Sequence, residues 1–148
     1  TIFKIILPTS SSEKDAHVNL DQNQVVHGSG TILLVDDEEI IRSTGAHLLH
    51  ELGYIVILAE NGQRAVEVYK DHMTDIDLVI LDIVMPIMDG RVAYKLIRSI
   101  NPDIPIIISS GFAKDVSMTD ILKDRRVMFM MKPFSFGDLS TLVAESLR

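Results

Sequence analysis

The sequence predicts an α/β domain of the doubly wound class, built on a five-stranded parallel sheet. Five short apolar runs, rich in branched side chains, alternate with segments of helical periodicity, which is the pattern of strands joined by crossover helices. The runs show little polar alternation, as expected of strands that are covered on both faces. The expected strands lie at 31–36, 54–59, 77–82, 104–109 and 127–131.

The segments between these strands predict helices of unequal quality. The first helix is expected over 38–52, with one apolar stripe and Gly53 as its C-terminal stop. Gly45 lies inside it and should cost about 1 kcal/mol relative to alanine, unless another group packs closely there. The fourth helix, around 116–123, has the weakest apolar stripe of the set.

Capping residues mark the beginnings of the other helices. Asn61 and Asp89 are the expected N-caps of the second and third helices. Ser135, followed three residues later by Asp138, predicts a capping box at the start of a last helix over 136–147.

Composition excludes several classes of protein. The chain has 148 residues, of which 47% are hydrophobic, so one domain with a real core is expected. A formal net charge of −7 argues against a nucleic-acid surface, which needs clustered Lys and Arg. The absence of cysteine excludes disulfides and thiolate metal sites. With no spanning run and no signal peptide in the sequence, a cytoplasmic location without membrane contact is expected.

Charged side chains that could bind a ligand or react follow three of the expected strands. Asp36 and Asp37 close the first strand and Asp82 closes the third. Lys132 follows the fifth strand. Because the carboxyl ends of parallel strands meet at the edge where open α/β sheets bind ligands, these residues predict a divalent metal beside an anion. Taken alone, Asp36 and Asp37 are about equally well interpreted as a helix cap.

Four motifs together resemble the receiver domain of two-component response regulators. They are VDDEE at 35–39, LDIVMPIMDG at 81–90, Ser110 after PIIIS, and MKPF at 131–134. The resemblance covers residues 31–148, in order and with family-like spacing. It implies the flavodoxin-like strand order 2-1-3-4-5.

The resemblance also implies a role for each site residue. Asp82 would be the phosphoacceptor, while Asp36 and Asp37 would hold Mg²⁺. The backbone carbonyl of Val84 would complete the metal site, and Lys132 would pair with the phosphoryl group. The Lys132–Pro133 bond is expected to be cis.

Three further positions carry regulatory roles in the family. Ser110 would be the hydroxyl that turns toward the phosphoryl group, and Phe129 falls at the switch-aromatic position, where tyrosine is frequent. Val84 and Phe112 would flank the path of the water that removes the phosphoryl group. Such a domain promotes its own phosphorylation and hydrolysis but turns over no separate substrate. The expected partner is a histidine kinase or a histidine phosphotransfer domain.

Three alternatives come from other classes. A haloacid dehalogenase-type phosphotransferase needs a second Asp two residues after the nucleophile, where this chain has Val84. A flavin module wants a Ser/Thr/Gly-rich phosphate loop after the first strand, where this chain has the acidic run DDEE. A receiver-like interaction module that is never phosphorylated stays open, because all the parts are present but the partner is not known.

The first thirty residues predict a different organisation from the rest. TIFKIILP, at 1–8, resembles the closing strand of the ATP-binding domain of histidine kinases. Residues 9–30 have the composition of a flexible linker, with the domain boundary near Ser29. The chain is therefore expected to be the C-terminal receiver of a hybrid histidine kinase. It should self-associate weakly or not at all, or exchange residues 2–7 as a strand between copies.

Overall fold

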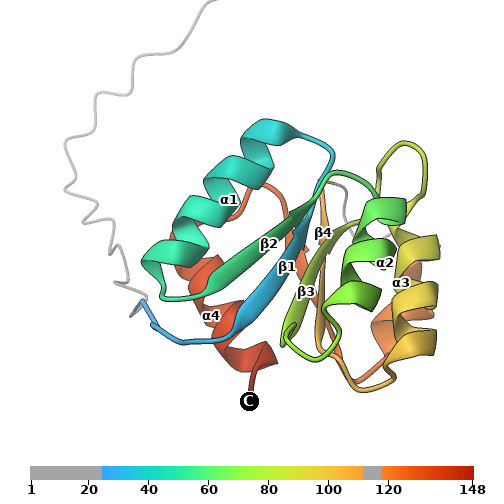
Figure 1. Ribbon diagram of the computed structural model, residues 1–148. Helices are drawn as coiled ribbons and strands as arrows, with labels where there is room; N and C mark the ends of the chain where they lie inside the picture. The colour runs from blue at the N-terminus through green and yellow to red at the C-terminus, as the bar shows by residue number, and fades with distance from the viewer. Residues whose placement is uncertain (1–24, 112–117) are drawn as a thin grey trace, which may run out of the picture.

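The computed structural model describes residues 25–111 and 118–148, and within them one parallel sheet of five strands. The strands run in the order β2-β1-β3-β4-β5, which confirms the predicted fold (Figure 1). Their bounds are β1 Thr31–Val35, β2 Ile55–Ala59, β3 Leu78–Asp82, β4 Ile106–Ser110 and β5 Val127–Met131. The expected strand at 2–7 and the position of Phe112 lie outside the described residues.

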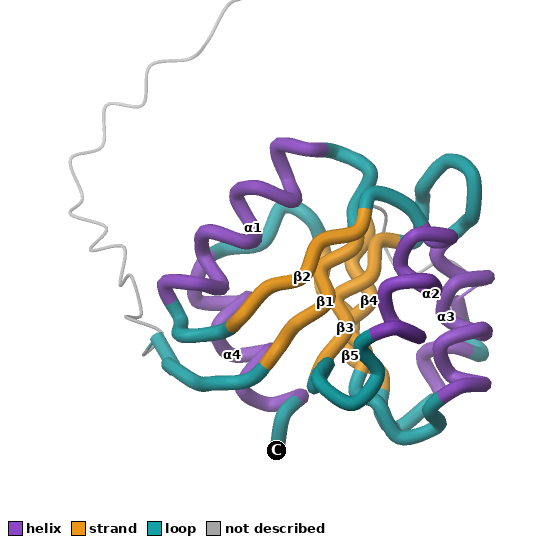
Figure 2. Tube along the Cα trace, in the orientation of Figure 1, coloured by secondary structure: helices purple, strands orange, loops and turns teal. Residues whose placement is uncertain are grey.

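Helices cover both faces of the sheet (Figure 2). Helices α1 (Glu39–Glu51) and α4 (Phe136–Ser146) pack on one face, and α2 (Gly62–Asp71) and α3 (Gly90–Ile100) on the other. Alternate side chains of each strand enter the two cores, which explains why the strands are apolar almost throughout. Among the described helices, none has the length and apolar character needed to cross a membrane.

The predicted caps are confirmed. Asn61 and Asp89 each accept a backbone N–H from the first turn of α2 and α3. Ser135 and Asp138 form the reciprocal capping box at the start of α4. These ends were predictable because a cap depends only on residues within one helical turn.

Close packing explains the glycine inside α1. A Cβ added at Gly45 would lie 2.9 Å from the Cδ2 atom of Leu34 on β1. A side chain at this position would require Leu34 to shift, so glycine allows a close contact between helix and sheet that offsets its low helix propensity.

The helix expected over 116–123 is wrong in its described part. From residue 118 onward the chain forms turns and short 3-10 stretches, among them Ile121–Lys123, before β5 begins. Met118 and Ile121 are buried in the core on the side of α2 and α3, while Asp124 accepts a hydrogen bond from the Tyr94 hydroxyl and pairs with Arg98 of α3. The described part of the segment is therefore ordered by the core and by α3 and not as a regular helix.

The residues just before β1 are bonded to the domain. The Val26 amide donates to the Ser140 hydroxyl at 2.6 Å, and the same hydroxyl lies 3.2 Å from the Val26 carbonyl. The Gly28 amide donates to the Leu52 carbonyl at 2.9 Å. The chain thus enters the sheet along α4 and the end of α1.

Candidate functional site

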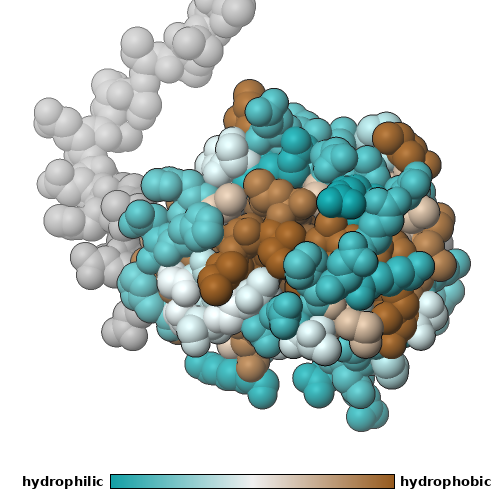
Figure 3. Space-filling model, in the orientation of Figure 1, coloured by the Kyte–Doolittle hydropathy of each residue, from teal (hydrophilic) through white to brown (hydrophobic). Residues whose placement is uncertain are grey.

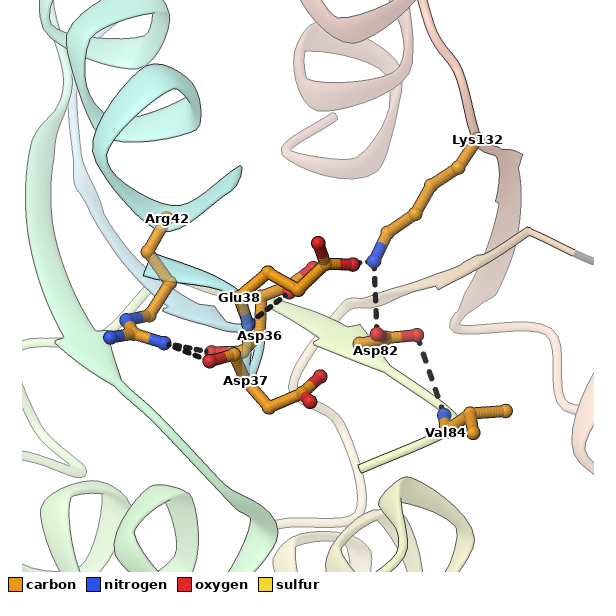
Figure 4. A network of polar contacts seen from close by, with 7 residues as sticks. All are labelled: Asp36, Asp37, Glu38, Arg42, Asp82, Val84 and Lys132. Carbon is orange, nitrogen blue, oxygen red and sulfur yellow. Dashed lines mark hydrogen bonds and ion pairs between the residues drawn. The ribbon is translucent and has the colours of Figure 1, made fainter. Parts of the chain in front are cut away.

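The strand ends bring the predicted site residues together at one edge of the sheet. Asp36 and Asp37 directly follow β1, and Asp82 is the last residue of β3. Lys132 directly follows β5. All of these strands run parallel, so their carboxyl ends share an edge, and the side chains converge there (Figure 4).

Three carboxylates at this edge form a candidate metal site. Asp36, Asp37 and Asp82 each offer an oxygen, and these oxygens lie within 4.8 Å of one another. Asp36 and Asp82 are 1% and 6% exposed, whereas Asp37 is exposed. A set of hard oxygen ligands with one side open to solvent fits Mg²⁺, which keeps several of its waters.

Lys132 partly neutralises these acids. Its ammonium lies 2.9 Å from Asp82 Oδ2 and also bonds the carboxylate of Asp36. Burial by itself lowers the pKa of Lys132, but the two carboxylates outweigh burial and raise the pKa above its ordinary value. Lys132 is therefore a fixed cation at neutral pH. The single ammonium leaves the three carboxylates with excess negative charge, which favours a second cation.

Burial governs the carboxyl group of Asp82. Loss of water raises its pKa above the ordinary value, against the opposing effect of the bond from Lys132. The Val84 amide approaches Asp82 Oδ1 at 3.4 Å, while the Val84 side chain is directed away from the carboxylate and is 59% exposed (Figure 4). Asp82 thus presents its oxygens at the edge of the sheet with Lys132 on one side and the following loop on the other.

Arg42 is a site residue that sequence patterns did not indicate. One of its guanidinium nitrogens donates to the backbone carbonyls of Asp36 and Asp37, at 2.7 and 2.8 Å. The Glu38 amide donates to Asp36 Oδ1 at 3.0 Å. These bonds fix the turn that carries the acidic pair. The available signal was that Arg42 is the only Lys or Arg within α1, one turn after the pair.

The other predicted features lie on β4, on β5 and directly after β5. Ser110 ends β4 and is 2% exposed, and its neighbour Ser109 pairs with Asp82 in the sheet register. Phe129 lies in the middle of β5 and packs, partly buried, against the core on the side of α2 and α3. The Lys132–Pro133 peptide bond is cis, as the resemblance implied.

Fold and site together define a class: doubly wound α/β domains with an acidic pocket and one lysine at the carboxyl edge of the sheet. Within this class, the model of the response regulator receiver domain matches residues 32–144. The chain belongs to this family.

Similar proteins include receivers of sensor kinases and free-standing receivers. The sensor kinase CckA of Brucella abortus is 38% identical over 99% of this chain, which spans only 16% of that kinase. The chemotaxis protein CheY of Bacillus subtilis is 39% identical over 70% of this chain and 85% of its own length.

Solved structures agree with these relatives. The receiver domain of the hybrid histidine kinase CckA superposes with a TM-score of 0.69 at 32% identity, over 80% of this chain and all of that one. The CheX-CheY-BeF3-Mg complex from Borrelia burgdorferi gives a TM-score of 0.75 at 28% identity, over 80% of this chain and 90% of that chain.

Proposed function

We propose that this domain accepts a phosphoryl group from a phosphohistidine onto the carboxylate of Asp82. The observation that carries the proposal is the buried Asp82 carboxylate, held 2.9 Å from the Lys132 ammonium beside two further acids. Burying a carboxylate beside other acids costs free energy, and groups in such settings are concentrated at functional sites.

The reaction follows from the groups present. An Asp82 oxygen forms a bond to phosphorus as the bond between phosphorus and the histidine nitrogen breaks, and the nitrogen retains the electron pair and is protonated by water. Mg²⁺, when bound by Asp36, Asp37, Asp82 and the carbonyl of Val84, would neutralise the charge that repels an incoming phosphoryl group. The Mg²⁺ in the similar CheX-CheY-BeF3-Mg complex from Borrelia burgdorferi supports this assignment.

Lys132 and Ser110 would serve the transferred group. Phosphoryl transfer asks chiefly for positioning and for positive charge near the equatorial oxygens. The Lys132 ammonium already lies at the acceptor oxygen, so its bond can pass to a phosphoryl oxygen. The Ser110 hydroxyl would turn toward the same group. The Phe129 ring would then change position, and this change would signal the phosphorylated state.

The partner class follows from the same chemistry. The donor would be a histidine kinase or a histidine phosphotransfer domain. The likeness to a sensor kinase over 99% of this chain supports a parent that is a hybrid kinase, with residues 1–8 closing its ATP-binding domain and 9–30 serving as linker. Residues 31–148 would then be its receiver.

One assay tests the function. Incubation with acetyl phosphate and Mg²⁺, followed by intact mass, should show one phosphoryl adduct, which Asp82→Asn removes completely. The variant should be at least as stable as the parent, because asparagine matches the shape of aspartate and relieves repulsion among the acids. Full labelling of the variant, or of the parent in excess chelator, contradicts the proposal. A parent that is never labelled is the receiver-like interaction module instead.

A further inference from the structure

Ile87 adopts a backbone conformation that suits its residue type poorly. Its φ is 71°, in the left-handed region, where a β-branched residue is a genuine outlier. The Met88 amide donates to the Pro86 carbonyl at 2.8 Å, which closes a three-residue turn around Ile87. Glycine or asparagine would adopt this conformation at much lower steric cost.

The Ile87 side chain does not contribute to the packing of the cores. Its side chain is 79% exposed, and it belongs to neither of the two cores. An apolar side chain in water and a strained backbone are both unfavourable for stability. Strain of this kind is concentrated at functional sites.

The position of the loop connects Ile87 to the site. The Gly90 amide donates to the Ile83 carbonyl at 2.9 Å, and a Cβ at Gly90 would lie 2.0 Å from the Asp82 carbonyl. The two ends of the loop are therefore in contact, and Ile87 lies in the turn between them, in the loop that directly follows the acceptor Asp82. Figure 3 shows apolar surface exposed over this loop, to the right of α1.

A second exposed isoleucine follows the acidic pair of the site. Ile40, at the start of α1, is 79% exposed. It lines a hollow of about 480 Å³ together with Lys132 and Phe134. Two exposed isoleucines thus follow the acids closely in the chain: Ile40 in the first turn of α1, three residues after Asp37, and Ile87 in the loop after β3, five residues after Asp82.

We propose that Ile87 is a recognition residue for the protein phosphodonor, which must present an apolar surface around its phosphohistidine. The inference rests on the proposed function. Because Asp82 is only 6% exposed, a donor histidine must approach closely, and the protein surface around that histidine then comes to lie against the start of α1, with Ile40, and the loop of Ile87. A small donor such as acetyl phosphate reaches Asp82 without touching either side chain.

The test separates recognition from chemistry with Ile87→Gly and Ile87→Asn. Both variants should unfold at a higher urea concentration, because the strain is relieved. Labelling by acetyl phosphate should stay within twofold of the parent. The probe is the fastest donor among the purified kinases and phosphotransfer proteins of the source organism, each in its phosphohistidine form. Transfer from it should slow at least tenfold, as a rise in KM and not a fall in kcat.

Controls decide between the outcomes. Ile55→Asn removes an equally apolar, 65% exposed side chain at the first residue of β2, at the opposite edge of the sheet, and should leave both rates unchanged. Transfer at the parent rate in both Ile87 variants, with normal acetyl phosphate labelling, overturns the recognition role alone. If the parent sediments as a dimer and Ile87→Gly does not, then Ile87 contacts a second copy of the chain and not the phosphodonor. This outcome also overturns the recognition role. A parent that acetyl phosphate never labels overturns the proposed function itself.

Discussion

Asp82 stands where burial and charge oppose each other. The flanking strands β1 and β4 remove water and raise the pKa of its carboxyl group, while the Lys132 ammonium holds the carboxylate in place. The lysine acts on both buried acids at once because β5 ends beside β4 at the same edge. The result is an acid that is fixed in orientation and still short of positive charge, as a metal-assisted phosphoacceptor requires.

Arg42 leads to the first prediction at this scale. Replacing it with glutamine leaves the carbonyls of Asp36 and Asp37 without their shared donor, so the acidic turn loosens. We expect Mg²⁺ affinity to fall about tenfold, in line with other residues that orient metal ligands. Calorimetric titration with Mg²⁺, together with the amide NMR signals of the turn, measures this directly.

Conservative and distant replacements serve as controls for Arg42. Arg42→Lys should recover part of the affinity, because it keeps a donor and the charge. Arg64→Gln alters an exposed pair on α2 and should change nothing at the site. Unchanged affinity and unchanged amide signals in Arg42→Gln would disprove the positioning role.

The lifetime of the phosphorylated form gives a second prediction. Val84 and Phe112 are apolar, and neither can orient an attacking water, so hydrolysis should be slow. Val84→Asn and Phe112→Glu are each expected to accelerate decay about tenfold. The decay is followed by intact mass after removal of acetyl phosphate. The matched control is Val92→Asn, at an exposed position of α3. Equal or slower decay in both variants counts against the assignment.

The limits of sequence reasoning are visible at individual residues. The convergence of Asp36, Asp37 and Asp82 was predictable because the carboxyl ends of parallel strands meet at one edge of the sheet. Arg42 was not, because its role depends on a long side chain reaching back to two carbonyls. The exposure and strain of Ile87 were equally hidden, since φ at a loop residue is set by the hydrogen bond that closes the turn.

At the scale of elements, the predictions that depended on local sequence were correct, and the one that depended on tertiary contacts was wrong. Helix ends defined by a cap within one turn were predicted correctly. The segment after β4 was not, because tertiary contacts order it, among them a partly buried network with α3. Arg98 of α3 pairs with Asp124 at 2.8 Å and lies over the ring of Tyr94, whose hydroxyl also bonds Asp124. No periodicity in the segment itself reveals such contacts.

This network gives a prediction about pH. Burial raises the pKa of Asp124, but bonds from the Arg126 amide, the Tyr94 hydroxyl and Arg98 outweigh burial and lower it below its ordinary value. A depressed pKa in the folded state means that Asp124 stabilises the fold above its unfolded-state pKa. That stabilisation is lost as pH falls through the folded pKa.

Asp124→Asn tests the network. We expect it to lower the free energy of unfolding at pH 7 by about 2 kcal/mol, the worth of a hydrogen bond to a charged group. Urea unfolding as a function of pH should show the difference shrinking in acid. Asp103→Asn, on an exposed turn nearby, should run parallel to the parent at every pH. A difference that stays constant with pH would mean that charge is not the cause.

At the scale of the whole molecule, the alternation of five strands and helices predicted a parallel sheet with few possible windings, and the resemblance to receivers selected the order that the structure confirms. The boundary of the folded unit is harder to predict. Residues 25–30 read as linker by composition, yet backbone bonds tie them to α4 and to the end of α1. A polar, glycine-containing segment can bind through its backbone, which composition does not report.

The last prediction concerns this attachment and where the folded unit begins. Ser140 is fully buried and holds both the N–H and the C=O of Val26. Ser140→Ala should lower the free energy of unfolding of the full chain by about 1–2 kcal/mol and speed hydrogen exchange at 26–30. In a chain that begins at residue 31 the same substitution should be nearly neutral, because its partner is gone.

The two changes form a cycle in which a shared interaction appears as non-additivity. Ser99→Ala, which removes an exposed hydroxyl bonded within its own helix, should be neutral in both chains. Additive losses would mean that Ser140 matters only for packing of α4, and that the segment before β1 is held by other bonds. Non-additive losses would place the start of the folded unit before β1, at Val26, whose backbone Ser140 holds.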